Sequence, residues 1–372
     1  MSTKYLKNFC PCFIYLIIVL LSITNCKKKV AALDIPVLDD RIHFISAIAA
    51  PDTTCSPKKF YFGLETIAYG PRDTLFAYDG YNHQVIVFSV SSGQELFRFG
   101  RKGEGPGEFS SFVAPIFFIS EKGLTIIDNI LRRVTEFNSY GKLIKIFKLP
   151  LLADNLIIIN DSLLVMSNFL LVESWKPLRL FNYKTNKILC EFGKIVEPTT
   201  GLFKAIATSP FRASDEELFS YGFMTRIVYL AKEKRVVLSQ KNPYCLSCWS
   251  LCSDDGKFFQ VKVPYSTEKG FKYKVKGDSR IASLLPTARI FGPFMVNSML
   301  VAVIFDPQCK ENYLDTYNLD GIFLKRYRIP ALPQDVSAKS VDFDGNNRMF
   351  ILVNEKKEDM DWIEVYKCEI GT

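Results

Sequence analysis

The sequence predicts an all-β fold, and three observations support this prediction. Hydrophobic residues make up 48% of the chain and aromatic residues 14%, with 31 Phe and 17 Tyr, a composition that suits half-buried strands. A pair of alternating strands joined by a short polar turn recurs along the chain. No stretch after residue 27 shows the long apolar period of a helix. The chain is therefore expected to fold as sheets.

The clearest repeat is a β-hairpin that occurs twice with an offset of 49 residues. Residues 85–99 contain a strand that ends at Phe88, a turn with Gly, and a second strand. Residues 134–147 repeat this pattern around Phe137, and an Asp stands nine residues before the aromatic residue in both copies. Alternation on both sides of a short turn with Gly is typical of a hairpin.

Weaker copies of the hairpin continue to the end of the chain. The last large apolar residue of the first hairpin strand defines an anchor position; the anchors are residues 88, 137, 181, 251, 317 and 366. Further apolar strands usually lie upstream, which gives three or four strands per unit of about 45–50 residues, the signature of a β-propeller blade. Six anchors predict a six-bladed β-propeller.

Two details of this propeller were open at the level of sequence. Tyr229 could be a further anchor, which leaves a seven-bladed propeller as the alternative. Against this, residues 227–263 already contain four consecutive strand patterns, enough for one blade. Residues 60–62, which precede the first blade, are expected to add a strand to the last blade, because such closure protects the sheet edges.

Residues 100–109 read GRKGEGPGEF and separate two apolar strand patterns. Four glycines and a proline exclude the interior of a strand or helix, so this stretch is predicted to be a turn between blades. The turn resembles the one that follows the first blade in bacterial six-bladed β-propeller lipoproteins of the TolB-like and NHL-repeat-like kind. The D-x2-N-x2-V-x2-F pattern of residues 79–88 resembles the NHL-type blade, although Leu131 replaces the Asn in the second copy. The resemblance implies a propeller at the cell envelope, and no particular activity.

Residues 1–25 are predicted to be a signal peptide. Two lysines precede residues 13–23, an apolar run of eleven residues, and a membrane-spanning helix needs about 20. The run leads to Cys26 and resembles the bacterial lipoprotein signal, in which such a Cys is lipidated and becomes the first residue. Asn25 departs from the small residue usual before this Cys. An uncleaved anchor and an ordinary signal peptide are the alternatives.

Residues 26–40 are then the lipidated Cys and a tether, and residues 41–372 are the propeller domain. Lysines at residues 27–29 would favour an anionic membrane surface. No acidic cluster follows Cys26, so we expect a periplasm-facing position at the bacterial outer membrane. The formal net charge of +8 is spread along the chain without a basic stripe, so nucleic acid is not predicted as a partner.

The Gly-rich stretch could instead hold a phosphate. A phosphate loop requires Gly-Lys-Ser/Thr at the start of a helix, whereas Glu108 and Phe109 follow the last glycine. The inter-blade turn is therefore the favoured interpretation. The charged residues of this turn are the candidate binding residues on a face of the ring: Arg101, Lys102, Glu104 and Glu108.

The cysteines do not predict a disulfide framework. Of the ten, seven remain after the signal peptide and Cys26, an odd number. Cys245, Cys248 and Cys252 could bind a metal, but they lie on a predicted strand without a fourth ligand. We interpret them as buried cysteines or as part of one disulfide. Residues 342–347 resemble the start of a calcium loop, but the oxygen ligands that should follow are missing, which favours a hairpin turn.

No catalytic residue, metal site or cofactor is predicted. The chain has two histidines, and neither stands beside a Gly-x-Ser-x-Gly nucleophile pattern. The favoured function is a non-enzymatic module that binds a protein or glycan or serves as a scaffold, tethered to the membrane by its lipid anchor. The alternative is a metal-dependent propeller hydrolase or lyase, and converging carboxylate, Asn or His side chains at the central channel would favour it.

Overall fold

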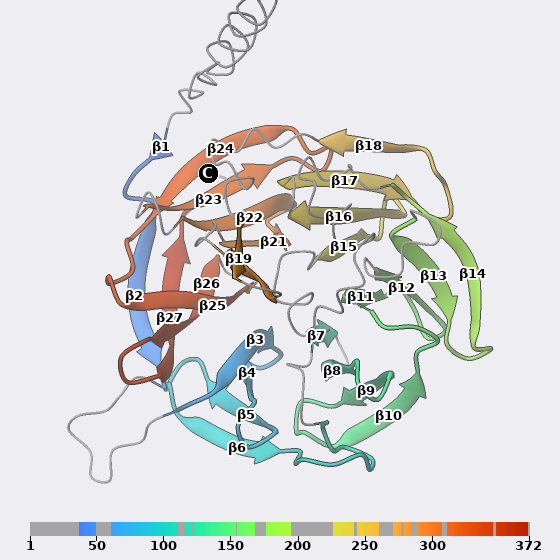
Figure 1. The fold of residues 1–372 in the computed structure, drawn as a ribbon, viewed down its shortest axis with the longest axis horizontal. Helices are drawn as coiled ribbons and strands as arrows, with labels where there is room; N and C mark the ends of the chain where they lie inside the picture. The colour runs from blue at the N-terminus through green and yellow to red at the C-terminus, as the bar shows by residue number, and fades with distance from the viewer. Residues whose placement is uncertain are drawn as a thin grey trace, which may run out of the picture. The chain divides into compact units, whose positions relative to one another are not determined.

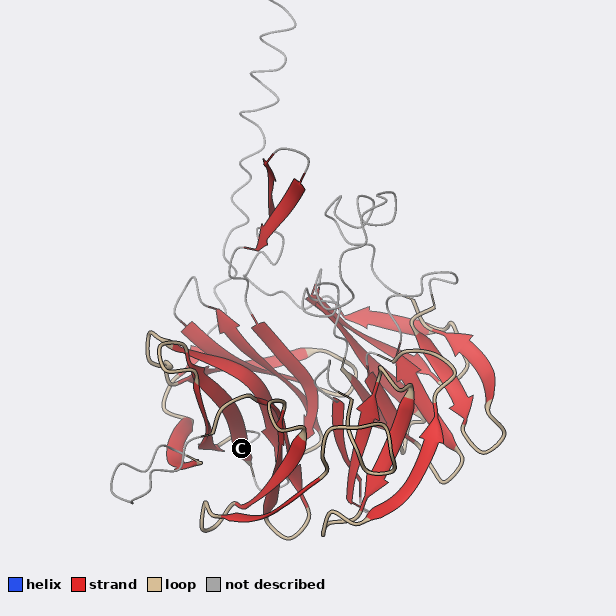
Figure 2. Cartoon of the chain, turned by 60° about the horizontal axis from the view of Figure 1, so that its bottom comes forward, coloured by secondary structure: helices blue, strands red, loops and turns tan. Residues whose placement is uncertain are grey.

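The structure is a computed structural model that describes most of the chain after residue 36. The described residues are 37–49, 61–110, 116–120, 123–153, 155–167, 176–194, 226–241, 244–259, 271–276, 279–284, 289–306, 311–344 and 347–370. The predicted signal peptide, Cys26 and most of the tether lie outside them. Every regular element within these ranges is a β-strand (Figure 2). In the same ranges, no helix has the length and apolarity needed to cross a membrane.

The strands form six antiparallel blades within one compact unit, Pro36–Thr372 (Figure 1). Blade 1 contains β3 (Leu64–Gly70), β4 (Thr74–Asp79), β5 (Gln84–Ser89) and β6 (Glu95–Phe99). Blade 2 contains β7 (Ile116–Ser120), β8 (Gly123–Asp128), β9 (Arg133–Phe137) and β10 (Leu143–Lys148). Blade 3 contains β11 (Asn155–Ile158), β12 (Leu163–Ser167), β13 (Leu178–Asn182) and β14 (Lys187–Phe192). Strand order within each blade follows the chain.

Blade 4 contains β15 (Ile227–Leu230), β16 (Arg235–Lys241), β17 (Tyr244–Ser250) and β18 (Gly256–Phe259). Blade 5 contains β21 (Arg289–Val296), β22 (Met299–Asp306), β23 (Glu311–Tyr317) and β24 (Phe323–Ile329). Blade 6 contains β25 (Val336–Phe343), β26 (Arg348–Glu355) and β27 (Met360–Cys368), together with β2 (Ile42–Ile48). A separate hairpin, β19 (Phe271–Lys276) and β20 (Ser279–Leu284), lies between blades 4 and 5 in sequence. The first strand of each blade lies innermost in the ring (Figure 1); we call these the inner strands.

Six hydrophobic clusters fill the spaces between the blades. Each cluster combines buried residues of two neighbouring blades, for example Phe76 and Tyr78 of blade 1 with Leu124 and Ile126 of blade 2. The same holds for blades 2 and 3, 3 and 4, 4 and 5, and 5 and 6. The sixth cluster joins blade 6 to blade 1, so the series closes into a ring. The six-bladed prediction is confirmed, and the seven-bladed alternative is wrong.

The first strand of the hairpin repeat found in the sequence corresponds to the third strand of each blade. Its anchor residue pairs with a buried apolar residue of the second strand, as Phe88 does with Leu75 and Phe137 does with Leu124. In blade 4 the equivalent residue is Trp249, which pairs with Val236 and is 1% exposed. The predicted anchor, Leu251, lies in the following turn. That prediction was wrong by two residues, because both residues share the alternation of the strand.

The ring closes with a strand from the N-terminal side of the first blade. β2 pairs antiparallel with β27 as the outer strand of blade 6, so three strands from the C-terminal end and one from the N-terminal end share a sheet. The closing strand was expected near residues 60–62. Tyr61 instead makes a single bridge to Asp361, and the preceding residue lies outside the described ranges. Closure itself is confirmed, with the closing strand about twenty residues earlier. Just before it, β1 (Val37–Leu38) pairs in parallel with β24.

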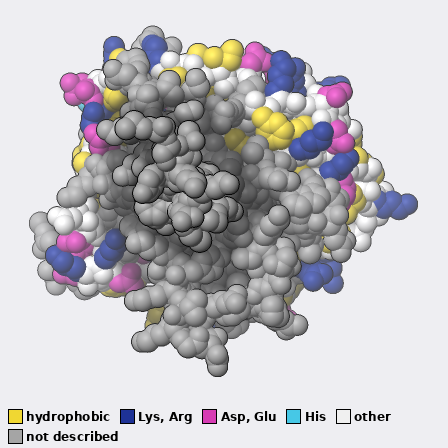
Figure 3. Space-filling model, turned by 45° about the horizontal axis from the view of Figure 1, so that its top comes forward, with side chains coloured by type: hydrophobic (Ala, Val, Ile, Leu, Met, Phe, Trp, Pro, Cys, Tyr) yellow, Lys and Arg dark blue, Asp and Glu magenta, His cyan; other side chains and the backbone are white. Residues whose placement is uncertain are grey.

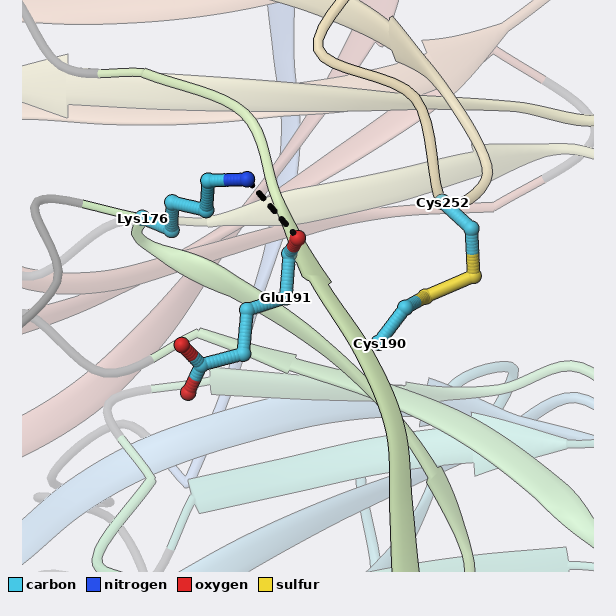
Figure 4. Close-up of a disulfide and its surroundings, with 4 residues drawn as sticks. All are labelled: Lys176, Cys190, Glu191 and Cys252. Atoms are coloured by element: carbon cyan, nitrogen blue, oxygen red, sulfur yellow. Dashed lines mark hydrogen bonds between the residues drawn. A yellow bond between two sulfur atoms is a disulfide. The ribbon is translucent and has the colours of Figure 1, made fainter.

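A disulfide joins blades 3 and 4. Cys190 of β14 bonds to Cys252, which follows β17, with a Cα–Cα distance of 5.7 Å (Figure 4). Near this disulfide, Lys176 donates from Nζ to the Glu191 carbonyl at 3.5 Å (Figure 4) and to Asp254 Oδ2 at 2.8 Å. The expectation that the cysteines are only scattered core residues is therefore wrong for this pair. Spacing failed to predict the bond because the partners are 62 residues apart and meet only when two blades pack.

We expect loss of this disulfide to lower the free energy of unfolding by about 2–4 kcal/mol, because it closes a long loop in the unfolded chain. Denaturant unfolding of Cys190→Ser/Cys252→Ser against the wild type measures this loss. A reducing agent should destabilise the wild type and leave the double variant unchanged. Equal sensitivity of both proteins to reduction would contradict the assignment.

Candidate functional site

The predicted binding turn is bonded mainly to itself. The Arg101 guanidinium lies 2.6 Å from Glu108 Oε1, and the Gly105 amide donates to Glu108 Oε2 at 2.7 Å. These donors, the backbone amide first, hold the pKa of Glu108 below its ordinary value. Arg101, Lys102 and Glu104 are exposed, while Glu108 is half-buried. Glu108 therefore organises the turn from within.

The turn also locks blade 1 to blade 2. Arg133 of β9 donates to the Glu104 carbonyl at 2.6 Å and to the Glu108 carbonyl. Phe109 is 2% exposed and belongs to the cluster between the two blades. Gly100 has φ +86°, and a Cβ there would lie 2.1 Å from the Phe109 ring, so the approach of the chain requires glycine. The inter-blade turn is confirmed; a binding role for its exposed side chains stays a prediction.

The paired aspartates of the repeat cap the turns after the second strands. Asp79 accepts from the Asn82 amide at 2.9 Å and from the Asn82 side chain at 2.8 Å. Asp128 accepts from the Leu131 amide at 3.0 Å, and since Leu131 has no side-chain donor, Ser110 donates to both carboxylate oxygens instead. The one departure in the repeat is thus compensated by the residue that follows the Gly-rich turn.

A different group of polar residues lies at the centre of the ring. The inner edges of the inner strands have no further strand to pair with, and unpaired backbone groups need partners. On β25, Ser340 accepts from the Ile67 amide at 3.3 Å and Asp342 accepts from the Tyr69 amide at 2.7 Å. Side chains of blade 6 thereby satisfy the backbone edge of blade 1.

Asp342 also meets an arginine from blade 4. Arg226 Nη2 lies 3.3 Å from Asp342 Oδ1, and the guanidinium lies 4.0 Å from the Phe294 ring centre on β21. The two side chains keep 38% and 15% of their accessible surface. Burial nevertheless lowers the pKa of Arg226 and raises the pKa of Asp342, each against the attraction of the other. Both side chains thus keep part of their surface accessible to solvent although neighbouring groups surround them closely.

Arg289 adds a second guanidinium at this centre. It begins inner strand β21, is exposed, and donates from Nη1 to the Ala338 carbonyl on β25. Although the residue is exposed, partial burial of its guanidinium lowers its pKa, and no counter-charge among the described residues offsets that effect. We refer to Arg226, Arg289 and Asp342 as the central cluster. Within the described residues, two positive charges and one negative charge make up this cluster.

A second polar group seals blade 6 against blade 1. Lys339 donates from Nζ to the Leu64 carbonyl and to Asp361 Oδ1, both at 2.8 Å, while Asp361 Oδ2 accepts from the Leu64 amide at 2.8 Å. Lys339 and Glu65 are the extra residues of β-bulges in β25 and β3, a feature that redirects side chains. Burial raises the pKa of Glu65, and Lys339 opposes this shift.

Charge is distributed differently at the rim and at the centre. On the face that Figure 3 shows, Lys and Arg side chains alternate with Asp and Glu side chains around the rim. Among the inner strands and the residue before β15, charged residues occur only on blades 4, 5, 6 and 1; β7 and β11 carry none. The charges of the central cluster therefore come from blades 4, 5 and 6, on one side of the ring.

The described residues contain no group of three or more His, Cys, Asp or Glu side chains placed to hold a metal ion. Cys245 and Cys248 are free and buried, and Cys252 is in the disulfide, so each of the two alternatives given for this trio, buried cysteines or a disulfide, applies to part of it. Burial raises the pKa of Cys245 to about 12. The strands on either side of the calcium-like stretch, β25 and β26, pair antiparallel as the predicted hairpin requires, and Asp344 accepts from the Arg348 amide at 2.7 Å.

Comparisons with known proteins agree with this architecture. The sequence model of a family described as a 6-bladed beta-propeller, DUF5128, matches residues 58–238. A DUF4221 family member from Bacteroides vulgatus ATCC 8482 has a TM-score of 0.54 at 12% identity, over 88% of this chain and 98% of that one. A candidate exported protein of Bacteroides fragilis NCTC 9343 has a TM-score of 0.50 at 12% identity, over 90% and 97%. No curated protein matches the sequence. The chain is thus similar to six-bladed β-propellers, and the likenesses establish the fold.

Sequence reasoning missed the central cluster. Arg226 appeared only beside a strand pattern, Arg289 was not singled out, and Asp342 was read as part of a turn. The available signal was a charged residue at or within the first strand of blades 4, 5 and 6, where an inner strand is expected to be mostly apolar. That signal does not reveal which charges meet.

The raised pKa of Glu65 predicts a pH effect on stability. Its folded-state pKa lies above the ordinary value, so the folded chain retains the proton more readily than the unfolded chain, and this stabilisation is lost as pH rises through the folded pKa. Glu65→Gln mimics the protonated form, so its stability relative to wild type should rise from about pH 4 to about pH 8. Thermal unfolding across this range measures the trend. Glu104→Gln, at an exposed position, is the control; a Glu65→Gln curve parallel to the wild type would refute the interpretation.

The central and the surface ion pair should contribute differently to the free energy of unfolding. Asp342→Asn removes the charge opposite Arg226, and we expect a loss of about 1–3 kcal/mol because the closely surrounded guanidinium loses its carboxylate partner. Arg101→Gln breaks the exposed pair with Glu108 and should cost under about 1 kcal/mol. Urea unfolding of both variants makes the comparison, and equal losses would contradict the central placement of Asp342.

Proposed function

We propose that this chain is an exported, lipid-anchored binding module of the bacterial cell envelope, with its ligand site at the centre of the propeller. Among propeller lipoproteins it would be of the TolB-like and NHL-repeat-like kind that its turn and first blade resemble. The ligand would be a protein segment or a glycan. The lipid on Cys26 would hold the module at the periplasmic side of the outer membrane.

The central cluster is the observation that carries the binding role. Arg226 and Asp342 come from blades 4 and 6 and keep accessible surface, while Arg289 is exposed on the inner strand of blade 5. Ligand sites are typically concave and place a few convergent polar groups on a rigid scaffold. Three chain segments far apart in sequence supply such groups here, on strands fixed by the blade cores.

Export is supported by two independent features. The disulfide between Cys190 and Cys252 is of the kind that persists in oxidising compartments such as the periplasm. The N-terminal pattern of two lysines, an apolar run and Cys26 is that of a lipoprotein signal. The likeness to a candidate exported protein of Bacteroides fragilis is in keeping with this location.

A binding experiment tests the central site. The full chain is screened with soluble glycans and peptides by thermal shift, and each hit is repeated with the Arg226→Gln variant. A ligand of the ring centre should bind the variant at least several-fold more weakly. Hits that bind both proteins equally would place the ligand elsewhere, and turnover of any hit by the wild type would instead support the hydrolase or lyase alternative.

The lipid anchor predicts a change of location on mutation. In cells of a bacterial host with lipoprotein processing, the wild type should fractionate with membranes and incorporate labelled fatty acid, because Cys26 carries the lipid. Cys26→Ala should lose the label. Cys55→Ala is the matched control and should keep it. Label retained by Cys26→Ala would refute the anchor.

A further inference from the structure

Arg289 is the cation of the central cluster whose charge is not matched by a carboxylate of the described residues. Its guanidinium makes one hydrogen bond to the described residues, from Nη1 to the Ala338 carbonyl. A guanidinium has five N–H donors in a planar fork, so Nε and Nη2 stay available within this part of the chain. Arg226, by contrast, faces Asp342 at 3.3 Å, which neutralises it locally.

The two guanidinium groups are held at different heights along β25. Arg289 reaches Ala338 and Arg226 reaches Asp342, four residues further along the strand. In a regular strand this separation corresponds to about 13 Å. An anion at Arg289 therefore does not need to displace Asp342 from Arg226, and the ion pair can stay intact while the site fills.

An aromatic ring accompanies Arg289 on the same strand. Residues two apart in a strand point to the same face, which places Phe291 beside Arg289. Phe291 is half-buried and meets Phe305 edge to face, with 5.8 Å between ring centres. The ring thus offers a partly accessible apolar surface next to the available guanidinium donors.

We propose that Arg289 and Phe291 form a subsite for a carboxylate-bearing part of that ligand, with the carboxylate on the Arg289 fork and an apolar or ring-shaped body against Phe291. Arginine favours this assignment because its planar donors match a carboxylate in two-point geometry. The burial that lowers the pKa of Arg289 without a counter-charge among the described residues gives the site a reason to attract an anion. The subsite rests on the proposed binding function and specifies its ligand chemistry.

Three probes separate the parts of this subsite. Benzoate carries both the carboxylate and the ring, acetate carries only the carboxylate, and benzamide carries the ring without the charge. Binding to the full chain is measured by ligand-observed NMR at constant ionic strength. We expect benzoate to bind in the millimolar range, acetate more weakly, and benzamide at least about tenfold more weakly than benzoate.

Variants assign the effects to the two residues. Arg289→Gln should weaken benzoate about tenfold or more and abolish its advantage over benzamide. Phe291→Leu should weaken benzoate but leave acetate unchanged. Arg132→Gln removes an exposed arginine from a turn of blade 2 and should leave all affinities unchanged.

Four outcomes would overturn the subsite. They are equal binding of benzoate and benzamide, no saturable benzoate binding, unchanged affinity in Arg289→Gln, and tighter binding of inorganic phosphate than of either carboxylate. If Arg226→Gln weakens the binding of a glycan or peptide and Arg289→Gln leaves that binding unchanged, the subsite is refuted and the proposed function stands. If benzoate binding depends on Arg289 but no glycan or peptide binds, the anion-binding subsite stands and the proposed protein or glycan ligand is refuted.

Discussion

Packing between neighbouring blades is the constraint on which the rest of this structure depends. No blade covers its own apolar faces, so each of the six clusters is shared by two sheets, and the sixth cluster, between blades 6 and 1, must form for the facing sides of those two blades to be removed from water. The ring therefore requires the pairing of β2 with β27, which unites the two ends of the propeller. Blade packing supplies the hydrophobic stabilisation, and strand closure fixes the number of blades.

The same ring geometry leaves backbone hydrogen-bonding groups without strand partners at its centre, and charged side chains lie there. Inner strands end a sheet, so their inner backbone groups need side-chain partners from the next blade. Ser340 and Asp342 serve this purpose for β3. Asp342 accepts from that edge and is neutralised by Arg226, whereas the bond of Arg289 within the described ranges is to a carbonyl. The groups proposed to bind ligand thus arise beside groups that hold the blades together.

The junction between blades 3 and 4 and the junction between blades 6 and 1 both carry ties in addition to their apolar clusters. Blades 3 and 4 are joined by the Cys190–Cys252 disulfide and by Lys176 with Asp254. Blades 6 and 1 are joined by Lys339 and Asp361 and, further along, by Arg348 of β26, which lies 2.6 Å from Asp73. At the second junction the chain runs from β2, the outer strand of blade 6, to β3 of blade 1, and these hydrogen bonds and ion pairs tie the C-terminal strands of blade 6 to blade 1 as well.

The sequence by itself determined the features that depend on near neighbours. Period-two alternation, Gly-containing turns and the 49-residue offset predicted hairpins and blades, and residues 100–109 predicted a turn, because backbone conformation and local burial are set within a few residues. Only the tertiary structure decided the closing strand, the disulfide partners, and the meeting of Arg226 with Asp342. Those partners are separated by 62 residues in the disulfide and by 116 in the ion pair, and no local pattern records which blades become neighbours across a closed ring.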